Sequence, residues 1–354
     1  MTIRTFILTI STNTGSPLPR CSYLLLFLFI SASCNLDSNN RTNVDLVPEE
    51  IEITRFEQLI CSGGQNNSQD NINQIIKDYP EFTDVFFNQV IFPSNQESIH
   101  IDSLVKFYCQ SKAVQHLTDT INILFPALEN LKEELKIGIS YYLHYFPEQN
   151  KPKIFTYISE FGIGTFVTGS GILGIGLDFY LGSEYPYYDP SVFPHFVQQT
   201  MKPEYMSSNA IRALTENLVP PPTDGNMLDF MIRNGKILYV MSRFLPETEL
   251  YKICMYTPEQ MDWVNENELS IWQFILDSGL LYEQDARKFV KYIDRAPSSP
   301  GMPPESPGRV ANWTGYKIIE SYMNQNPEIS LSVLANNTDY QTIMDNARYK
   351  PSRK

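Results

Sequence analysis

The sequence predicts an α+β fold that is mostly helical, with a small, central and mainly antiparallel sheet. Two observations support this prediction. Apolar residues recur every three or four positions from Ile75 to Ile139 and again after Pro190, which is typical of amphipathic helices. Between these stretches, short apolar runs are separated by glycines, which is typical of strands joined by tight turns. No internal repeat is evident, so residues 51–354 are expected to form a single domain.

The N-terminal elements follow from local patterns. Ile51–Phe56 alternates between apolar and polar residues and is predicted to be a short first strand. Cys61–Asn73 contains two adjacent glycines and four asparagines, so it is predicted to be a loop. Helical spacing begins at Ile75, and its apolar positions include Phe82, Phe86, Val90, Leu104, Phe107, Tyr108, Leu124, Leu128, Leu131 and Leu135.

Three further strands are predicted in the middle of the chain, at Lys153–Ile158, Gly164–Thr168 and Ile172–Tyr180. Gly169–Gly174 formally matches the GxGxxG pattern of dinucleotide-binding folds. Such a site needs a helix directly after the glycines, because the helix N-terminus binds the pyrophosphate. Here an apolar run typical of a strand follows, so the glycines indicate a tight hairpin rather than a nucleotide site.

Helical spacing returns in the C-terminal part. A proline-rich segment, Ala296–Arg309, is predicted to be a loop between helices. The predicted helices are Ala210–Val219, Met227–Phe244, Pro258–Leu281, Glu283–Asp294, Trp313–Asn324 and Ile329–Asn346.

The N-terminus has the pattern of an export signal that ends in a lipoprotein acylation site. Arg20 precedes the apolar run Tyr23–Ile30, and three small residues lead to Cys34. The run is much shorter than the roughly 20 apolar residues of a membrane-spanning helix. We therefore expect residues 1–33 to be a lipoprotein signal peptide, Cys34 to be acylated, and residues 34–50 to be a polar tether.

Two features of the signal are unusual, and one alternative remains open. Ser31 occupies a position where an aliphatic residue is common, and the first twenty residues are polar, which suggests a misassigned start. The alternative to a signal is that Tyr23–Ile30 is a core segment. Without residues 1–33 the chain loses two arginines and no acid, so its formal charge changes from −13 to −15. Such a surface repels nucleic acid and anionic lipid, so membrane attachment would depend on the acyl chains.

Cysteines and histidines indicate neither a disulfide framework nor a metal site. Beyond Cys34 there are Cys61, Cys109 and Cys254, an odd number at wide spacing, which favours three inert thiols over one optional bridge. There is no CxxC, no Cys/His cluster and no HExxH among the four histidines. We therefore expect no metal and no cofactor.

Several charged residues occupy positions where apolar neighbours predict burial. Glu268 shares a predicted helical face with Val264, Ile271, Trp272 and Ile275, and Lys236 is flanked by Ile232, Tyr239 and Val240. A buried charge must be paired, hydrogen-bonded or neutralised. The candidate polar centre comprises Asp178, Tyr180, Glu184, Lys236, Glu268 and Arg309, with Tyr187 and Tyr188 beside it. The alternative is a structural ion-pair network that ties loops to helices.

The chain resembles the gliding motility lipoprotein B (GldB) family from about residue 45 to the end. The motifs that support this resemblance are Gly176-Leu-Asp-Phe-Tyr-Leu-Gly182 with Tyr185-Pro186, Gly235-Lys236-Ile-Leu-Tyr239, Tyr256-Thr-Pro-Glu-Gln260 with Trp263, Asn265-Glu-Asn-Glu-Leu-Ser-Ile-Trp272, Leu280-Leu-Tyr282, and Ser306-Pro-Gly-Arg309 with Trp313, Gly315 and Tyr322-Met323. The resemblance implies a lipoprotein anchored in the cell envelope and facing the periplasm. It would support the gliding machinery and its associated protein secretion.

The family in turn is similar to zincin-type metallopeptidases, which implies a zincin-like fold with a degenerate metal site. Zincins carry HExxH on one helix and a third ligand, a Glu before a Gly, on the next. Here the corresponding helix, Asn209–Val219, contains no histidine, and Asn234 precedes Gly235. Glu216 alone would not hold zinc. The resemblance thus implies a non-enzymatic pseudo-peptidase that binds protein components of the machinery and no nucleic acid. The alternative is a metal-independent or degenerate periplasmic hydrolase that uses clustered carboxylates.

Overall fold

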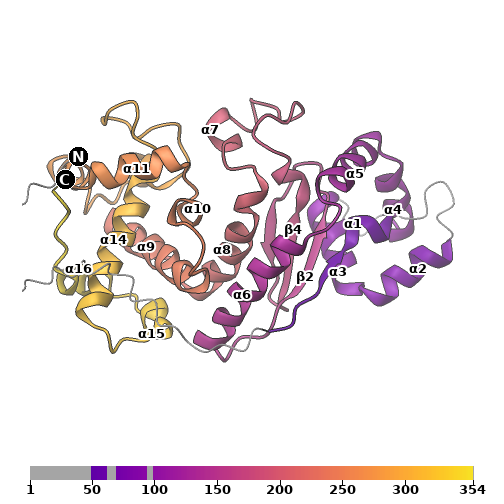
Figure 1. The fold of residues 1–354 in the computed structure, drawn as a ribbon, viewed down its shortest axis with the longest axis horizontal. Coiled ribbons are helices and arrows are strands. Elements are labelled where there is room, and N and C mark those ends of the chain that lie inside the picture. Colours follow the sequence, from indigo (N-terminus) through magenta and orange to yellow (C-terminus); the bar gives the residue numbers. More distant parts are fainter. Residues whose placement is uncertain (1–48, 62–68, 94–98, 354) are drawn as a thin grey trace, which may run out of the picture. The chain divides into compact units, whose positions relative to one another are not determined.

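A four-stranded mixed sheet lies between two sets of helices in the computed structural model (Figure 1), which describes residues 49–61, 69–93 and 99–353. These residues belong to one compact unit, residues 41–354. The expected signal peptide, Cys34 and the tether up to residue 48 lie outside the described residues. The strands are β1 (Ile53–Arg55), β2 (Lys153–Tyr157), β3 (Thr165–Val167) and β4 (Ile172–Gly176), in the order β1-β2-β4-β3.

The α+β class is confirmed, but the prediction of a mainly antiparallel sheet is wrong. β1 pairs with β2 and β2 pairs with β4 in parallel, and only β3 and β4 are antiparallel. The reason is topological. Helices connect β1 to β2 in a crossover, and after β2 the chain first forms the edge strand β3 and then returns in a hairpin to β4, which lies between β2 and β3 and so runs parallel to β2. The predicted hairpin at Gly169–Gly174 is confirmed, because Gly171 donates its N–H to Thr168 O and has a φ of 89°.

The last predicted strand is shorter than expected. It ends at Gly176, and a 3₁₀-helix, η3 (Leu177–Tyr180), follows directly. Asp178 and Tyr180 therefore lie beyond the C-terminal end of β4 and not within the sheet.

The first set of helices confirms the helical prediction from Ile75 to Ile139. The predicted loop Cys61–Asn73 is too long at its C-terminal end, because a helix already begins at Gln69. The elements are α1 (Phe56–Ile60), α2 (Gln69–Asp78), α3 (Pro80–Val85), a π-helix η2 (Phe86–Ile91), α4 (Ile101–Gln110), α5 (Lys112–Leu124) and α6 (Glu129–Tyr145). Although α6 precedes β2 in the chain, it packs with the helices of the second set.

The second set shows both confirmed and incorrect boundaries. The prediction Met227–Phe244 is confirmed to the residue. The helix begins at Met227 because Asn226 and Asp229 form a reciprocal capping box. The elements are α7 (His195–Gln198), η4 (Pro203–Tyr205), α8 (Met206–Leu218), α9 (Met227–Phe244), α10 (Leu250–Cys254), α11 (Pro258–Glu266), α12 (Glu268–Asp277), α13 (Ala286–Ile293), α14 (Val310–Gln325), α15 (Leu331–Asn336) and α16 (Tyr340–Ala347).

Two long predicted helices are each divided in two. Pro258–Leu281 is interrupted at Asn267, whose φ of −108° and ψ of 18° leave the helical region, so α11 and α12 are separate. Ile329–Asn346 is interrupted between Asn336 and Tyr340, where Asp339 caps α16 by accepting from Thr342 N. Periodicity continues across both breaks because each pair of helices buries apolar residues in the same core.

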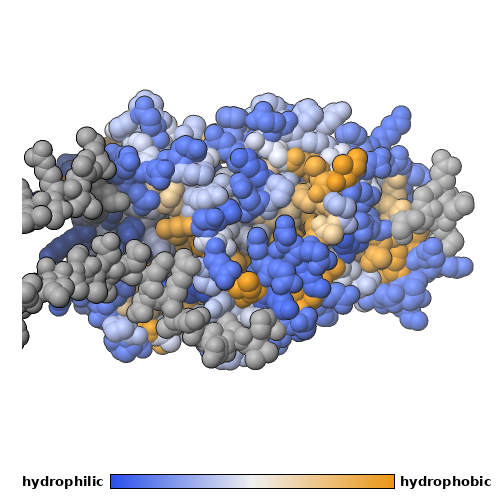
Figure 2. Space-filling view, viewed as in Figure 1, coloured by the Kyte–Doolittle hydropathy of each residue, from blue (hydrophilic) through white to orange (hydrophobic). Residues whose placement is uncertain are grey.

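The sheet separates two apolar cores. Ile154 of β2 belongs to the larger core, which also contains α6, α8, α9 and α14, whereas its neighbours Phe155 and Tyr157 belong to a smaller aromatic core. This division follows the two-residue period of a strand, whose successive side chains point to opposite faces. Outside these cores the surface in view is mostly hydrophilic, as Figure 2 shows, in keeping with the acidic composition.

A disulfide joins Cys61, at the end of α1, to Cys109 in α4. The prediction of three inert thiols is therefore wrong for this pair, while Cys254 is free and buried. The smaller core brings the two helices together, although 48 positions separate the cysteines in the sequence. None of the helices within the described ranges has the length and apolar character needed to cross a membrane.

Candidate functional site

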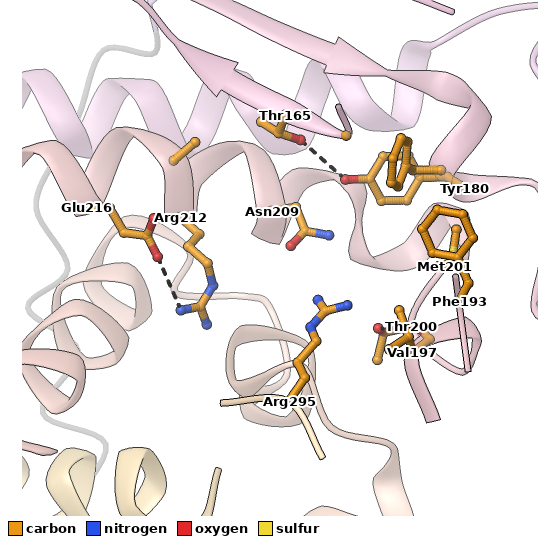
Figure 3. Close-up of a pocket in the computed structure, with 13 residues that line it drawn as sticks. Thr165, Tyr180, Phe193, Val197, Thr200, Met201, Asn209, Arg212, Glu216 and Arg295 are labelled. Carbon is orange, nitrogen blue, oxygen red and sulfur yellow. Dashed lines mark hydrogen bonds and ion pairs between the residues drawn. The ribbon is translucent and has the colours of Figure 1, made fainter. Parts of the chain in front are cut away.

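A cavity of about 330 Å³ lies between the end of the sheet, α8 and the segment that follows α13 (Figure 3). One face of α8 lines it, because Asn209, Arg212, Ala213 and Glu216 follow the i, i+3, i+4, i+7 spacing. α8 also packs on β3, β4 and α6, which places this face beside the sheet. The other lining residues are Gly164, Thr165, Phe179, Tyr180, Phe193, Val197, Thr200, Met201 and Arg295.

Two guanidinium groups enter the cavity from different parts of the chain. Figure 3 shows Arg212 extending from α8, and Arg295 extending toward α8 from the segment after α13. Arg212 donates from Nη2 to Ile253 O at 2.9 Å, and its Nη1 lies 3.9 Å from Glu216 Oε1. Its Nε is buried and has no hydrogen-bond partner among the described residues. Arg212 is therefore oriented by the fold but only partly paired.

A third arginine lies next to the cavity. Arg309 lines a much smaller cavity that shares Thr200 and Arg295 with the first. Neither Arg295 nor Arg309 has a carboxylate within 4 Å in the part of the chain that the structure describes. Burial, and then the positive charges of Arg295 and Arg212, lower the pKa of Arg309 to about 9, so it remains protonated at neutral pH. The three side chains form one positive cluster in an acidic protein.

Hydrogen bonds hold the loop that carries Arg295 and Arg309. Ser299 Oγ donates to Pro307 O at 2.7 Å, and Tyr256 donates from its hydroxyl to Gly308 O at 3.0 Å. Gly308 packs so closely on Ala296 that a Cβ would lie 2.7 Å from backbone atoms of Ala296. The loop therefore presents both arginines from a well-supported backbone.

Tyr180 is the one predicted site residue that lines the larger cavity. Its hydroxyl lies 3.5 Å from Thr165 Oγ1, and either group can donate. Burial raises the pKa of Tyr180, while Thr165, Asn209 and Arg295 act in the opposite direction. The phenol therefore lies within the electrostatic reach of Arg295.

Asp178 does not line the cavity but holds the backbone turn that leads into its wall. The carboxylate is fully buried, and its Oδ2 accepts from Phe161 N at 2.6 Å and from Ser159 N at 3.2 Å. The turn that it holds contains two residues with left-handed backbone, Glu160 (φ 53°) and Phe161 (φ 64°), and leads into Gly164 of the cavity wall. Such backbone persists only where surrounding contacts enforce it. Asp178 thus has a positioning role.

Asp178→Asn should reduce the pH dependence of stability between about pH 4 and pH 6. Burial raises the pKa of Asp178 from 3.8 to about 6, against the opposing hydrogen bonds from Phe161 and Ser159. Because the folded state holds the proton more tightly, the contribution of Asp178 to stability is greatest at low pH and falls as the pH rises through about 6. The difference corresponds to roughly 3 kcal/mol. Urea unfolding at several pH values measures it.

The matched control is Asp277→Asn, which changes an exposed carboxylate at the end of α12. The control should keep the wild-type pH profile. If Asp178→Asn also keeps that profile, then Asp178 does not titrate in this range and the assigned cause is wrong.

Lys236 is fully buried and has a different environment. It donates to Ala335 O at 3.1 Å and Asn337 O at 2.8 Å, and its Nζ lies 5.2 Å from the ring centroid of Tyr340. These carbonyls lie at the C-terminal end of α15, where a cation is favourable. Burial, and then the charge of Arg233, lower the pKa of Lys236 to about 8. Lys236 therefore connects α9 to the end of α15.

Glu268 and Glu184 also lie outside the cavity. Glu268 is the first residue of α12, is 7% exposed and accepts from the Tyr349 hydroxyl at 2.9 Å. The predicted shared face with Val264 is wrong, because the helix is interrupted between them. Glu184 is exposed in the turn after η3. Tyr188, beside it, donates to Asp178 O and accepts from Leu181 N, both at 2.9 Å.

The six predicted residues thus do not share a common cavity. Tyr180 lines the larger cavity and Arg309 the adjacent one, whereas Asp178 supports the wall and the remaining residues stabilise other segments or face solvent. Among the described residues no side-chain hydrogen bond or ion pair links one of the six to another. Arg212 and Arg295, which line the larger cavity, were not predicted as site residues from the sequence. The spacing of Asn209, Arg212 and Glu216 on α8 was the available signal.

Within the described ranges, no three His, Cys, Asp or Glu side chains are grouped as metal ligands would be. The zincin-like relationship remains a prediction from the sequence.

A family model described as gliding motility protein GldB matches residues 37–351, which is nearly the whole chain. No curated protein and no solved structure matches.

Proposed function

The chain belongs to the gliding motility protein GldB family, and we propose that it is a non-enzymatic lipoprotein of the cell envelope that supports the gliding machinery and its associated protein secretion. Acyl chains on Cys34 would hold it to a membrane, and residues 34–50 would connect this anchor to the folded body in the periplasm. The body would bind other protein components of the machinery.

The observation that supports this proposal most directly is the position of the family match. The match begins at residue 37, directly after the expected acylation site, and continues to residue 351. The part that would remain after signal cleavage before Cys34 is therefore the part that belongs to the family. Two or more acyl chains suffice for stable anchoring, since each buried methylene contributes about 0.8 kcal/mol.

The charges of the site favour binding over carboxylate catalysis. General acid–base chemistry by two acids needs both carboxylates within reach of one substrate. Asp178 and Glu268 instead accept hydrogen bonds from separate structural partners, Phe161 and Tyr349. The cavity presents cations and one carboxylate, Glu216. This set of groups suits recognition of a charged partner.

Cys34→Ala should release the protein from the membrane and abolish gliding. Without the thiol no acyl chain can be attached, so the hydrophobic contribution of the anchor is lost completely. Membrane fractionation and metabolic labelling with a palmitate analogue measure attachment, and colony spreading measures motility. Cys21→Ala is the matched control, because it removes a nearby cysteine that precedes the apolar run.

Persistence of membrane attachment and acyl labelling in Cys34→Ala would contradict the anchoring part of the proposal. Stoichiometric, tightly held zinc in the purified wild-type protein would contradict the non-enzymatic part. The two outcomes are independent, since the first concerns the N-terminus and the second the folded body.

A further inference from the structure

The positive cluster of Arg212, Arg295 and Arg309 has fewer close counter-charges than a structural cluster would have, although the charge of Asp294 acts on Arg309. The one carboxylate in the larger cavity, Glu216, is 3.9 Å from Arg212, a distance at the limit of an ion pair. Buried or partly buried charges are normally paired, because removing one partner leaves an uncompensated charge that is strongly destabilising. Here three like charges are held near one another without comparable compensation from the described residues.

The arginines affect one another electrostatically. Burial and then Arg212 lower the pKa of Arg295, and burial followed by Arg295 and Arg212 lower that of Arg309. Mutual repulsion opposes folding, yet the loop that carries Arg295 and Arg309 is held by Ser299 and Tyr256 rather than left free to separate them. An arrangement that is unfavourable alone and yet well supported is typical of a preorganised binding site.

The cavity also offers neutral donors and an apolar wall. The amide of Asn209 and the hydroxyl of Tyr180 face the same space as the guanidinium groups of Arg212 and Arg295, as Figure 3 shows. The apolar wall consists of Phe179, Phe193, Val197 and Met201. A volume of about 330 Å³ is at the lower end of the range for small-molecule pockets.

We propose that this cavity binds a small organic anion that carries a carboxylate or phosphate group on an apolar body, with the oxyanion between Arg212 and Arg295. The forked geometry of guanidinium suits two-point contact with either group. Arg212 and Arg295 both line the cavity, so their guanidinium groups would donate to the anion. The apolar body would pack on Phe179 and Phe193. The site does not depend on the proposed function of the lipoprotein.

Calorimetric titration of the detergent-solubilised full-length protein tests the ligand class. The probes are N-acetyl-L-phenylalanine, phenyl phosphate, inorganic phosphate and the uncharged N-acetyl-L-phenylalanine amide. We expect at least one of the first two to bind, at least about tenfold more tightly than the last two. Tighter binding of phenyl phosphate would identify a phosphate group, and tighter binding of N-acetyl-L-phenylalanine a carboxylate, and either supports the proposal.

Arg295→Gln tests the arginine contact. It should weaken binding of the preferred probe by about tenfold or more, because a charge-assisted hydrogen bond is lost. The melting temperature should not fall, because no ion pair in the described structure is broken. Arg287→Gln is the control, since it makes the same change at an exposed arginine of α13 that pairs with Asp285. It should bind as wild type does.

Three outcomes would overturn the proposal. One is that none of the probes binds at millimolar concentration. Another is that the uncharged amide binds as tightly as the anions. The third is that Arg295→Gln keeps wild-type affinity, or lowers the melting temperature and so reveals a structural role for Arg295.

Discussion

Gly315→Ala should cause one of the largest losses of stability of any single substitution in this protein. Gly315 of α14 and Gly235 of α9 face each other where the two helices cross, and the helices touch backbone to backbone there. A Cβ on Gly315 would lie 2.0 Å from Met231 O, and a Cβ on Gly235 would lie 2.2 Å from Gly315 C. These neighbours are backbone atoms, so the clash can be relieved only by moving the helices apart.

The expected cost of Gly315→Ala is about 3 kcal/mol or more, at the upper end of the effects of overpacking. Separation of α9 and α14 would disturb the larger core, where both helices contribute fully buried residues such as Val240 and Ile318. For a chain of this size the melting temperature should fall by roughly 5 to 10 °C. Differential scanning calorimetry or thermal unfolding followed by circular dichroism measures this change.

Gly169→Ala is the control, because a Cβ at this exposed turn position would meet nothing within 4 Å. It should leave the melting temperature nearly unchanged. An equal, small effect of both substitutions would mean that the helices can separate at little cost, and the close crossing would not be a determinant of the fold.

The sequence predicted those parts of the fold that local signals determine. α9 was predicted to the residue because its capping residue, Asn226, directly precedes the apolar pattern. The hairpin between β3 and β4 was predicted because glycines interrupt two apolar runs. The parallel pairing of β1 with β2 was not predicted, since about a hundred residues separate these strands and no local pattern records which strands pair.

One residue, Asn267, explains why the prediction of a single helix over Pro258–Leu281 was wrong. Asn267 interrupts the helical backbone between Val264 and Glu268, but the apolar spacing continues through it because α11 and α12 face the same core. Periodicity therefore merges the two helices and places Val264 and Glu268 on one continuous helical face, although Glu268 is buried with Ile271 and Ile275 of α12.

The sequence indicated the buried charges but not the cavity. Asp178, Lys236 and Glu268 are buried, as their apolar neighbours indicated, with exposed fractions of 0%, 0% and 7%. Their hydrogen-bond partners are distant in the sequence or come from the backbone, such as the carbonyls at the end of α15, although Asp178 Oδ1 has no partner among the described residues. Arg212 and Arg295 line one cavity because α8 and the segment after α13 both border it in the fold, which spacing along the chain cannot show.

Replacing Cys61 and Cys109 together by alanine should destabilise the protein by about 4 kcal/mol. The disulfide closes a loop with a sequence separation of 48, and cross-linking such a loop restricts the unfolded chain by about this amount in the chain-entropy model. The residues that would lose this support form the smaller core around Phe56 and Phe86. Guanidinium unfolding should show a lower midpoint for the double variant than for wild type.

A reductant distinguishes loss of the disulfide from loss of the two cysteine side chains as the cause of a lower unfolding midpoint. Reduced wild type should unfold at nearly the same midpoint as the double variant, and the double variant should not respond to reductant. Cys254→Ala is the control for removal of a thiol, because Cys254 is free and buried, and it should keep the wild-type response to reductant. If the midpoint of wild type is the same with and without reductant, the disulfide does not stabilise the fold.

The disulfide also links the stability of this protein to its compartment. Disulfides persist in oxidising compartments such as the periplasm and are rare in the cytosol, where thiols are kept reduced. Protein that is retained in the cytosol by deletion of residues 1–33 should therefore resemble the Cys61→Ala, Cys109→Ala variant in its unfolding midpoint. Under the proposed export to the periplasm, exported protein should resemble oxidised wild type, because an oxidising compartment would allow Cys61 and Cys109 to pair.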